Sequence, residues 1–348
     1  MNTLYNNLIL IFASSTISFF IAYFISPSFI KFVKNLKIQQ QIKTETVGGS
    51  KTPLFHALHK NKSGTPTMGG FVIWFSVIIT CLLSILSSKL GITTFNLINQ
   101  KETYLALFTL STFGLLGAVD DYFNVRGIGK TKGLAAKTKF IWMTFFAILG
   151  AYWFTFKLGY SSISLLNNQY EIGLWYFPLF VALITASSNA VNITDGLDGL
   201  ASGLSILTFI SLGIISYTQG LYILATFCAT IVGATGAFMW NNIPPAKYFM
   251  GDTGSLALGG TMAVIACLTD TILVFPFLTA IFIIETLSVI IQLTSKRYFK
   301  RKVFDIAPIH HHFEHNGWPE YKVTMRFWMI GAFFCIFGII LYLGGIIH

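Results

Sequence analysis

Five aspartates in this chain stand at the ends of long apolar stretches, where they could do chemistry at the edge of a membrane. They are Asp120, Asp121, Asp195, Asp198 and Asp252. A carboxylate at the centre of a membrane helix costs roughly 2.5–3.5 kcal/mol on insertion scales, and less near the interface. Clustered carboxylates are typical ligands of a divalent cation. The placement therefore predicts a cation-binding active site at the membrane rim.

The segment 189–200 has the most regular polar spacing. In a helix, Asn189, Asn192, Asp195 and Asp198 would recur every third residue and fall along one side. Two amides and two carboxylates at that period favour a functional stripe. An ordinary Asp-Gly turn is the alternative.

The other aspartates allow two roles each. Asp120 and Asp121 end an apolar stretch, and neighbours on a helix point about 100° apart, so they are expected to do different jobs. One can face a metal or phosphate while the other accepts a proton or anchors a lysine, unless both simply end the span in headgroup water. Asp252 lies between Gly251 and Gly254 before another apolar stretch, which suits metal coordination or helix capping.

Three consecutive histidines, His310, His311 and His312, lie inside a long polar loop. Consecutive histidines cannot easily converge on one metal ion, and no cysteine lies near them. Hydrogen bonding to a phosphate or a base is therefore expected, with simple surface exposure as the alternative.

Two weaker groups complete the candidates. The run 62–70 offers Lys62, Thr67 and flexible backbone, a plausible phosphate contact although it is not a Walker motif. A further polar face in the ninth apolar stretch can support the site or be purely structural, and it consists of Glu285, Ser288 and Gln292.

The composition predicts that membrane helices carry these residues. With 54% hydrophobic and 10% charged residues over 348 positions, and a mean hydropathy of +0.69, the chain is too apolar for one soluble core. The predicted fold is all-α, a single polytopic domain (1–348) with about ten transmembrane helices. The apolar stretches are 8–30, 69–86, 104–119, 140–156, 175–191, 201–217, 221–240, 255–273, 275–293 and 327–347.

Basic residues predict the orientation. Of the 23 lysines and arginines, only Lys89, Lys101 and Lys157 fall outside the loops that follow the first, third, seventh and ninth stretches. Lysine-rich and arginine-rich loops stay cytoplasmic, so both termini are expected on the outer side. The first stretch is expected to be retained, because residues 1–7 lack the basic start of a signal peptide. The expected cytoplasmic loops are approximately 31–68, 120–139, 192–200, 241–254 and 294–326.

Together these motifs resemble the phospho-N-acetylmuramoyl-pentapeptide transferase family, over nearly the whole chain. The runs that carry the resemblance, in the family's order, are 64–70, 120–122, 189–199, 249–260 and 307–312. The run 308–312 separates this family from relatives that transfer N-acetylglucosamine 1-phosphate. Lys62 and Lys137 are the candidates for direct phosphate contact, although the loop after Asp121 is one residue longer than the family's, which makes its lysines hard to align. Pro244 and Lys247 also depart from the family's pattern, and this puts fine nucleotide contacts in doubt.

The resemblance implies an activity in peptidoglycan synthesis at the bacterial cytoplasmic membrane, with the active site facing the cytoplasm. The phosphate of undecaprenyl phosphate would attack the sugar-linked phosphate of UDP-N-acetylmuramoyl-pentapeptide, giving lipid I and UMP. By similarity Asp252 would hold Mg²⁺, with Asn192 as a further candidate ligand. Asp120 would be the base toward the lipid phosphate, assisted by Asp121. Residue types leave open a covalent phospho-enzyme or direct attack.

The same resemblance places the nucleotide. Phe249 would stack on uracil beside Asn242, while Asp195 and Asp198 would bind the nucleotide or tune the site. Membrane lipid and a second copy of the chain are further expected partners, and nucleic acid is not. The full expected substrate-binding set is Lys62, Thr67, Lys137, Asn189, Asn192, Asp195, Asp198, Asn242, Phe249, Gln292, His310, His311 and His312.

Two other functions fit parts of the pattern. A sister transferase would use UDP-N-acetylglucosamine, which the histidine run disfavours. An ion-coupled transporter would place its carboxylates near mid-membrane between paired repeats, whereas here they gather at helix ends and no repeat is visible.

Overall fold

Long helices make up most of the protein, as its apolar composition predicts. The computed structural model describes residues 2–39, 62, 64–93, 95–99, 101–129, 133–165 and 168–345. The expected loop 31–68 therefore lies largely outside the described residues. In chain order the long helices are α1 (Asn2–Asn35), α3 (Gly70–Lys89), α4 (Lys101–Arg126), α5 (Ala136–Tyr152), α6 (Tyr176–Thr194), α7 (Leu200–Thr218), α8 (Tyr222–Asn242), α9 (Asp252–Leu268), α11 (Ala280–Tyr298) and α13 (Glu320–Leu343).

Short elements connect the long helices. A two-stranded antiparallel hairpin, in which Ser162 lies opposite Glu171, is a small departure from the expected all-α class. The short elements are η2 (Trp153–Lys157), β1 (Ser162–Leu165), β2 (Asn168–Glu171), η3 (Gly173–Trp175), α10 (Phe275–Leu278) and α12 (Ile309–His315).

Within the described residues, eight helices are long and apolar enough to cross a membrane, so the polytopic architecture is confirmed but the expected count of ten is not. The eight are α1, α3, α4, α5 with η2, α6 with η3, α7, α8 and α13. The apolar helix α9 is shorter, with 17 residues. The remaining long helix, α11, is continuous, but polar residues divide its apolar sequence. These residues, Glu285, Ser288 and Gln292, are all buried.

Several helices continue further into the polar segments than the hydropathy pattern predicted. Helix α4 extends to Arg126, so Asp120 and Asp121 lie inside it rather than in a loop. Helix α6 instead ends at Thr194, before two of the four residues expected on its polar side. Gly199 follows with a φ of +78°, a backbone conformation that favours glycine and breaks the helical register.

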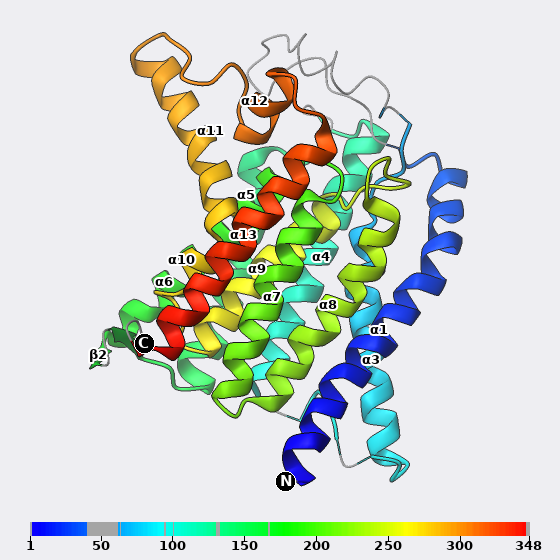
Figure 1. The fold of residues 1–348 in the computed structure, drawn as a ribbon, viewed down its shortest axis with the longest axis vertical. Helices are drawn as coiled ribbons and strands as arrows, with labels where there is room; N and C mark the ends of the chain where they lie inside the picture. The colour runs from blue at the N-terminus through cyan, green and yellow to red at the C-terminus, as the bar shows by residue number, and fades with distance from the viewer. Residues whose placement is uncertain are drawn as a thin grey trace.

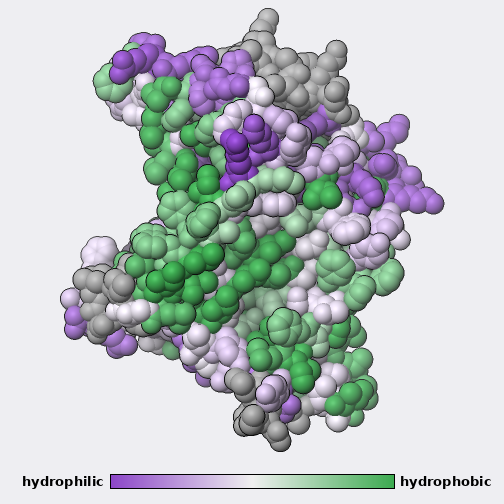
Figure 2. Space-filling model, in the orientation of Figure 1, coloured by the Kyte–Doolittle hydropathy of each residue, from purple (hydrophilic) through white to green (hydrophobic). Residues whose placement is uncertain are grey.

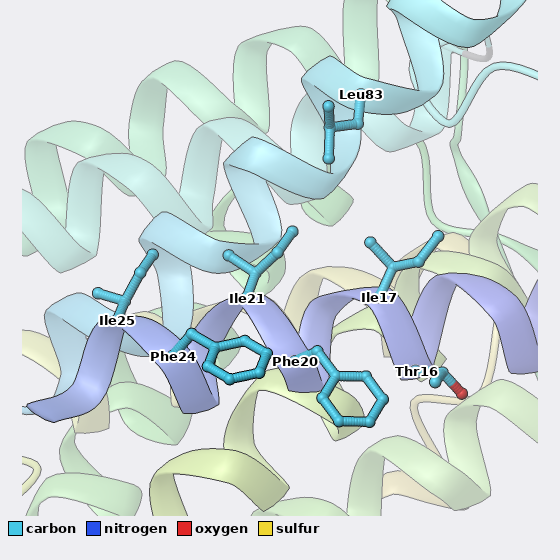
Figure 3. A pocket seen from close by; sticks show the side chains of 7 residues that line it. All are labelled: Thr16, Ile17, Phe20, Ile21, Phe24, Ile25 and Leu83. Carbon is cyan, nitrogen blue, oxygen red and sulfur yellow. The ribbon is translucent and has the colours of Figure 1, made fainter.

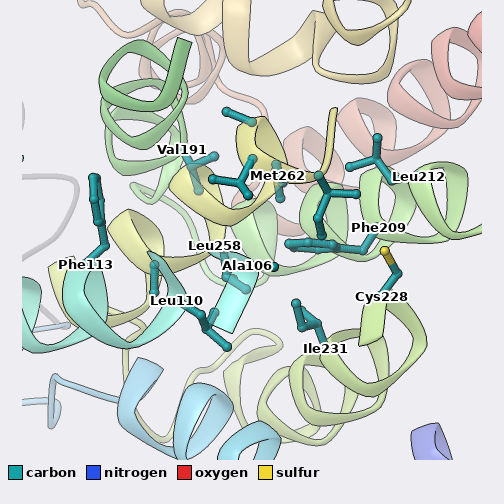
Figure 4. Packing of buried hydrophobic residues seen from close by; sticks show 14 of the residues in the cluster. Ala106, Leu110, Phe113, Val191, Phe209, Leu212, Cys228, Ile231, Leu258 and Met262 are labelled. Atoms are coloured by element: carbon teal, nitrogen blue, oxygen red, sulfur yellow. The ribbon is translucent and has the colours of Figure 1, made fainter. Parts of the chain in front are cut away.

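Helix α9 lies at the centre of the bundle. It packs against α4 and α6, with further contacts to α3 and α7, and every residue from Thr253 to Leu268 is buried. Figure 4 shows Leu258 and Met262 of α9 among apolar side chains from α4, α6, α7 and α8. The position of the α9 N-terminus is therefore fixed from several sides.

Small residues let the backbones around that N-terminus approach closely. A Cβ atom on Gly117 of α4 would lie 2.1 Å from the carbonyl oxygen of Asp252, and one on Gly70 of α3 would lie 2.1 Å from Gly254. Close approach at small residues is the usual way in which membrane helices pack. These two glycines bring α3 and α4 against the first turn of α9.

The surface separates an apolar middle from polar ends. In Figure 2 the green atoms form a broad zone across the visible face, whereas purple atoms gather toward the end that carries α11 and α12. Both chain ends lie toward the opposite side from α12 (Figure 1). A shallow apolar groove opens between α1 and α3 (Figure 3), lined by Thr16, Ile17, Phe20, Ile21, Phe24, Ile25 and Leu83. Such a surface suits contact with lipid chains.

The contact between α1 and α8 supplies a stability test. A Cβ on Gly233 would lie 2.0 Å from the carbonyl oxygen of Ser15, whereas the atom nearest a Cβ on Gly236 would be a ring carbon of Phe19 at 3.8 Å. We expect Gly233→Ala to lower stability by about 1–3 kcal/mol, because overpacking forces the helices apart. Gly236→Ala should be neutral or slightly stabilising. Thermal unfolding in detergent measures both, and equal shifts would contradict this packing.

Candidate active site

Asp121 holds the N-terminus of α9. Its Oδ1 accepts the backbone N–H of Asp252 at 3.1 Å, and its Oδ2 accepts the backbone N–H of Thr253 at 3.0 Å and the Thr253 hydroxyl at 2.6 Å. A carboxylate is stabilised there by the free N–H groups and the positive end of the helix dipole. Asp121 thus fixes the backbone from which the Asp252 side chain projects.

Asp120 faces a different set of partners, in keeping with its angle from Asp121 on the helix. Its Oδ1 accepts the backbone N–H of Leu134 at 2.7 Å, and its Oδ2 lies 2.8 Å from the Lys139 ammonium. The same ammonium contacts Asp252 Oδ2. One cation therefore lies between carboxylates that α4 and α9 supply.

Asn192 of α6 completes this centre. Its Nδ2 donates to Asp252 Oδ1 at 2.6 Å and to the Ser255 hydroxyl at 2.9 Å. Helices α5 and α6 thus each contribute a side chain, Lys139 and Asn192, to the carboxylate of Asp252 on α9. The Asp252 side chain is partly exposed, with 21% of its surface accessible.

A second group of charges lies where the α6–α7 connection meets the start of α13. The Lys62 ammonium is 2.8 Å from Asp198 Oδ1 and also contacts Glu320. Asp198 Oδ2 accepts the backbone N–H of Ala246 at 3.0 Å. The Lys62 ammonium also lies 5.8 Å from the ring centre of Phe249.

Backbone pairing joins the segment around Thr67 to the segment that carries Phe249. Phe249 N–H donates to Pro66 at 2.8 Å, and Gly69 N–H donates back to Phe249 at 2.8 Å. A Cβ on Gly251 would lie 2.8 Å from the Thr67 hydroxyl and 2.3 Å from Asp121 Oδ2. Thr67 and Asp121 therefore both lie close to Gly251, which precedes Asp252.

Asn242 acts on the backbone of both neighbouring loops. Its Oδ1 accepts the Gly199 N–H at 3.0 Å, and its Nδ2 donates to the Tyr248 carbonyl at 3.0 Å. It therefore ties the connection after Asp198 to the segment before Phe249.

The first two histidines of the run face inward and the third faces outward. His310 Nδ1 lies 2.9 Å from Glu285, and both side chains are fully buried. His311 Nδ1 lies 2.7 Å from Glu314. A Cβ on Gly196 would lie 2.3 Å from His310 Nε2 and 3.2 Å from His311 Nε2, so both rings pack on the α6–α7 connection.

His312 instead lies beside Asp305 at 3.2 Å, with 25% of its side chain exposed.

Burial, reinforced by the charge of His310, lowers the pKa of His311 to about 4, so its imidazole is neutral at neutral pH.

Three expected site residues have other partners or surroundings. Asn189 donates to the Thr185 carbonyl of its own helix at 2.8 Å. Gln292 holds the loop after α11, accepting the backbone N–H groups of Val303 and Phe304 at 3.0 Å each and donating to the Phe304 carbonyl at 2.7 Å. Lys137 is exposed near the start of α5. The structure thus does not bring these side chains to the Asp252 centre.

The structure adds two charged residues to the predicted set, Lys139 and Glu320. Lys139 lies between Asp120 and Asp252, whereas the predicted residue was Lys137, two positions earlier. Glu320 contacts Lys62 although it begins α13, far along the chain. Its acidic character gave no distinct signal in the sequence, because the same predicted loop also contains Asp305 and Glu314.

The carboxylates outnumber the lysines here, which favours an added cation. Among the described residues no group of three or more His, Cys, Asp or Glu side chains could hold a metal by itself. Mg²⁺, however, commonly takes one or two carboxylates and completes its shell with water and substrate phosphates. The ammonium between Asp120 and Asp252 shows that a positive charge fits between these two carboxylates.

Asp195, just after α6, is also affected by the negative charge of Asp252. Burial, together with the charge of Asp252, raises its pKa to about 7. Two like unit charges 4 Å apart repel by about 4 kcal/mol at an effective dielectric constant of about 20. An anionic substrate would meet this repulsion unless a cation accompanied it. The site is therefore suited to phosphate chemistry assisted by a divalent metal ion.

Comparison with known proteins gives concordant matches. The profile of Glycosyl transferase family 4 matches residues 103–270. A phospho-N-acetylmuramoyl-pentapeptide-transferase of Geobacillus sp. (strain WCH70) is 39% identical over 93% of this chain and 95% of its own length. The proteins of that name from Geobacillus thermodenitrificans (strain NG80-2) and Bacillus thuringiensis (strain Al Hakam) are 38% and 39% identical over 95% and 93% of this chain, and over 97% and 95% of their own lengths.

The two neighbouring lysines of α5 can be separated experimentally. We expect Lys139→Gln to lower stability by on the order of 2 kcal/mol, because it leaves Asp120 and Asp252 side by side without their shared cation. Lys137→Gln should leave stability within about 0.5 kcal/mol, since that side chain is exposed. The midpoint of thermal unfolding without added metal is the measurement. Equal midpoints for both variants would remove Lys139 from this role.

Proposed function

The chain belongs to the phospho-N-acetylmuramoyl-pentapeptide-transferase family, and from that membership we propose that it transfers phospho-N-acetylmuramoyl-pentapeptide from its UDP-linked form to undecaprenyl phosphate. The products are lipid I and UMP, in peptidoglycan synthesis. The observation that carries the proposal is the meeting of side chains from distant segments: Asp120 and Asp252 share the Lys139 ammonium, and Asn192 donates to Asp252. Both substrates are anionic, as such a cation-binding site requires.

The reaction forms a bond between an oxygen of the lipid phosphate and the sugar-linked phosphorus. The bond from that phosphorus to the oxygen of UMP breaks, so the leaving group carries the electron pair away. Asp120 accepts any proton on the attacking phosphate, and Asp121 holds the α9 N-terminus in place. Lys139 stabilises negative charge beside both carboxylates. We favour direct attack over a covalent phospho-enzyme.

The proposed cofactor is Mg²⁺, held by Asp252 with Asn192 beside it as a further candidate ligand. When bound, the ion neutralises charge on the phosphates and so reduces their mutual repulsion. The contact between Asn192 and Asp252 supports this assignment, because it orients the carboxylate.

The nucleotide is proposed to lie between Phe249 and the α6–α7 connection. Phe249 offers a partly exposed ring for uracil. Lys62 lies near that ring and is a candidate for phosphate contact. His310 and His311, packed on Gly196, form the neighbouring wall toward the sugar-peptide portion.

We place this site at the cytoplasmic face of the bacterial inner membrane, with both termini outside. The basic loops support this orientation, as does the arrangement of both chain ends away from α12 (Figure 1). The relatives do not favour the sister transferase that uses UDP-N-acetylglucosamine. A transporter is disfavoured because the carboxylates lie in the last two turns of α4 and at the start of α9 rather than at mid-helix.

The activity can be tested with purified enzyme, undecaprenyl phosphate and Mg²⁺. We expect UMP release with UDP-N-acetylmuramoyl-pentapeptide, at least about 100-fold faster than with UDP-N-acetylglucosamine, because a site built for specific polar groups rejects analogues that lack them. A chelator should stop release, and added Mg²⁺ should restore it. Faster release with UDP-N-acetylglucosamine would favour the sister activity, and full activity in chelator would remove the metal from the proposal.

The role of Asp252 is testable apart from turnover. We expect Mg²⁺ to raise the thermal unfolding midpoint of the native protein, because a ligand that binds only the folded state stabilises it. Asp252→Asn should abolish that rise and reduce UMP release by about 100-fold or more. Asp270→Asn, in the turn after α9, is the matched control and should retain the Mg²⁺-dependent rise. A normal Mg²⁺ response in Asp252→Asn would exclude this residue from the metal site.

A further inference from the structure

We propose that Glu320, the first residue of α13, is a positioning residue that sets the place of Asp198 and Lys62 and thereby the affinity for the nucleotide portion of the substrate. The inference rests on the proposed function and adds a residue to it. Its basis is a set of contacts between α13 and the α6–α7 connection.

One stripe of α13 holds the backbone of two adjacent residues. Glu320 Oε1 accepts the Asp198 N–H at 2.7 Å. One turn later the Thr324 hydroxyl donates to the Asp198 carbonyl at 3.3 Å, and after another turn the Trp328 indole donates to the Gly199 carbonyl at 3.2 Å. Residues four apart share a helix face, so α13 presents these three groups to one short segment.

Glu320 is the member of the stripe that also carries charge. Its Oε1 contacts the Lys62 ammonium as well as the Asp198 N–H. Lys62 in turn pairs with Asp198 Oδ1 at 2.8 Å. Burial acts to lower the pKa of Lys62, but the charges of Asp198 and Glu320 outweigh it and raise the pKa, so the ammonium stays charged. One carboxylate oxygen therefore orders both a backbone group and a cation.

A simple helix cap does not account for these contacts. An acidic residue in the first turn of a helix is stabilised by the helix dipole, and that explanation would aim Glu320 at the N-terminus of α13. Glu320 instead bonds Asp198 and Lys62, which are distant in sequence. It is partly exposed, with 20% of its side chain accessible, whereas Asp198 is 5% exposed.

The positioned groups are those placed beside the nucleotide. Asp198 also receives the Ala246 N–H, on the loop that leads to Phe249. Lys62 lies 5.8 Å from the Phe249 ring centre. Loss of Glu320 would loosen these groups before substrate binds, while leaving Asp120 and Asp252, where the bond forms, untouched. The effect should therefore appear in KM more than in kcat.

The test compares Glu320→Ala, Glu320→Gln and the native enzyme. The alanine variant loses both contacts, and its KM for UDP-N-acetylmuramoyl-pentapeptide should rise about tenfold with kcat within about twofold, since a hydrogen bond to a charged group is worth about that factor. The glutamine variant can still accept the Asp198 N–H, so its KM should rise about threefold or less. Glu171→Gln, on exposed β2, is the matched control and should change neither constant.

Hydrogen exchange of the peptide that contains residues 195–200 supplies a readout without substrate. Exchange there should be at least about tenfold faster in Glu320→Ala than in the native enzyme, because the Asp198 N–H loses its acceptor. Unchanged exchange, a KM that falls, or a loss of kcat at constant KM would each overturn the inference. If the native enzyme released no UMP, the proposed function would fail, while the exchange comparison would still decide whether Glu320 holds this segment.

Discussion

The arrangement depends on the neutralisation of carboxylates that are partly removed from water. Asp120 from α4 and Asp252 from α9 approach one another, and the Lys139 ammonium between them offsets their repulsion. Buried charges of one sign are tolerated only when they are paired and hydrogen-bonded. A site built in this way favours positive charge, which is consistent with the metal-assisted transfer between anionic substrates that we propose.

Helix packing converts that electrostatic demand into a defined geometry. Asp121 holds the first N–H groups of α9, and the absence of a side chain at Gly117 lets α4 approach the Asp252 backbone. Because α9 is buried along nearly its whole length, its N-terminus cannot shift without disturbing several neighbouring helices. The apolar bundle therefore serves the site by holding the N-terminus of α9 in place, while its helices α4, α5 and α6 supply Asp120, Lys139 and Asn192.

The sequence predicted the class of fold and the aspartates near Asp252, but it did not predict the charged residues that contact the site aspartates, Lys139 and Glu320. The placement of charges at the ends of apolar stretches pointed to Asp120, Asp121 and Asp252. Charged residues are costly in a bilayer, so those that are present there usually have a function. The placement could not choose Lys139 over Lys137, since both follow the same span and only the turn of α5 decides which one points inward. The predicted helix ends were also misplaced, because hydropathy marks where the apolar residues end, and a helix can continue into the polar residues that follow, as α4 does to Arg126.

Contacts between segments that are far apart in sequence form the part that no local pattern contains. Glu320 lies 122 positions from Asp198, yet it accepts that residue's backbone N–H. Nothing in residue spacing predicts such a pair, because it depends on how α13 crosses α7 and the connection before it. The close approach at Gly203, where a Cβ would lie 2.2 Å from the Trp328 ring, fixes that crossing. The close contact between Gly203 of α7 and Trp328 of α13, together with the hydrogen bonds of Thr324 and Trp328 to the α6–α7 connection, thus determines where the Glu320 carboxylate lies.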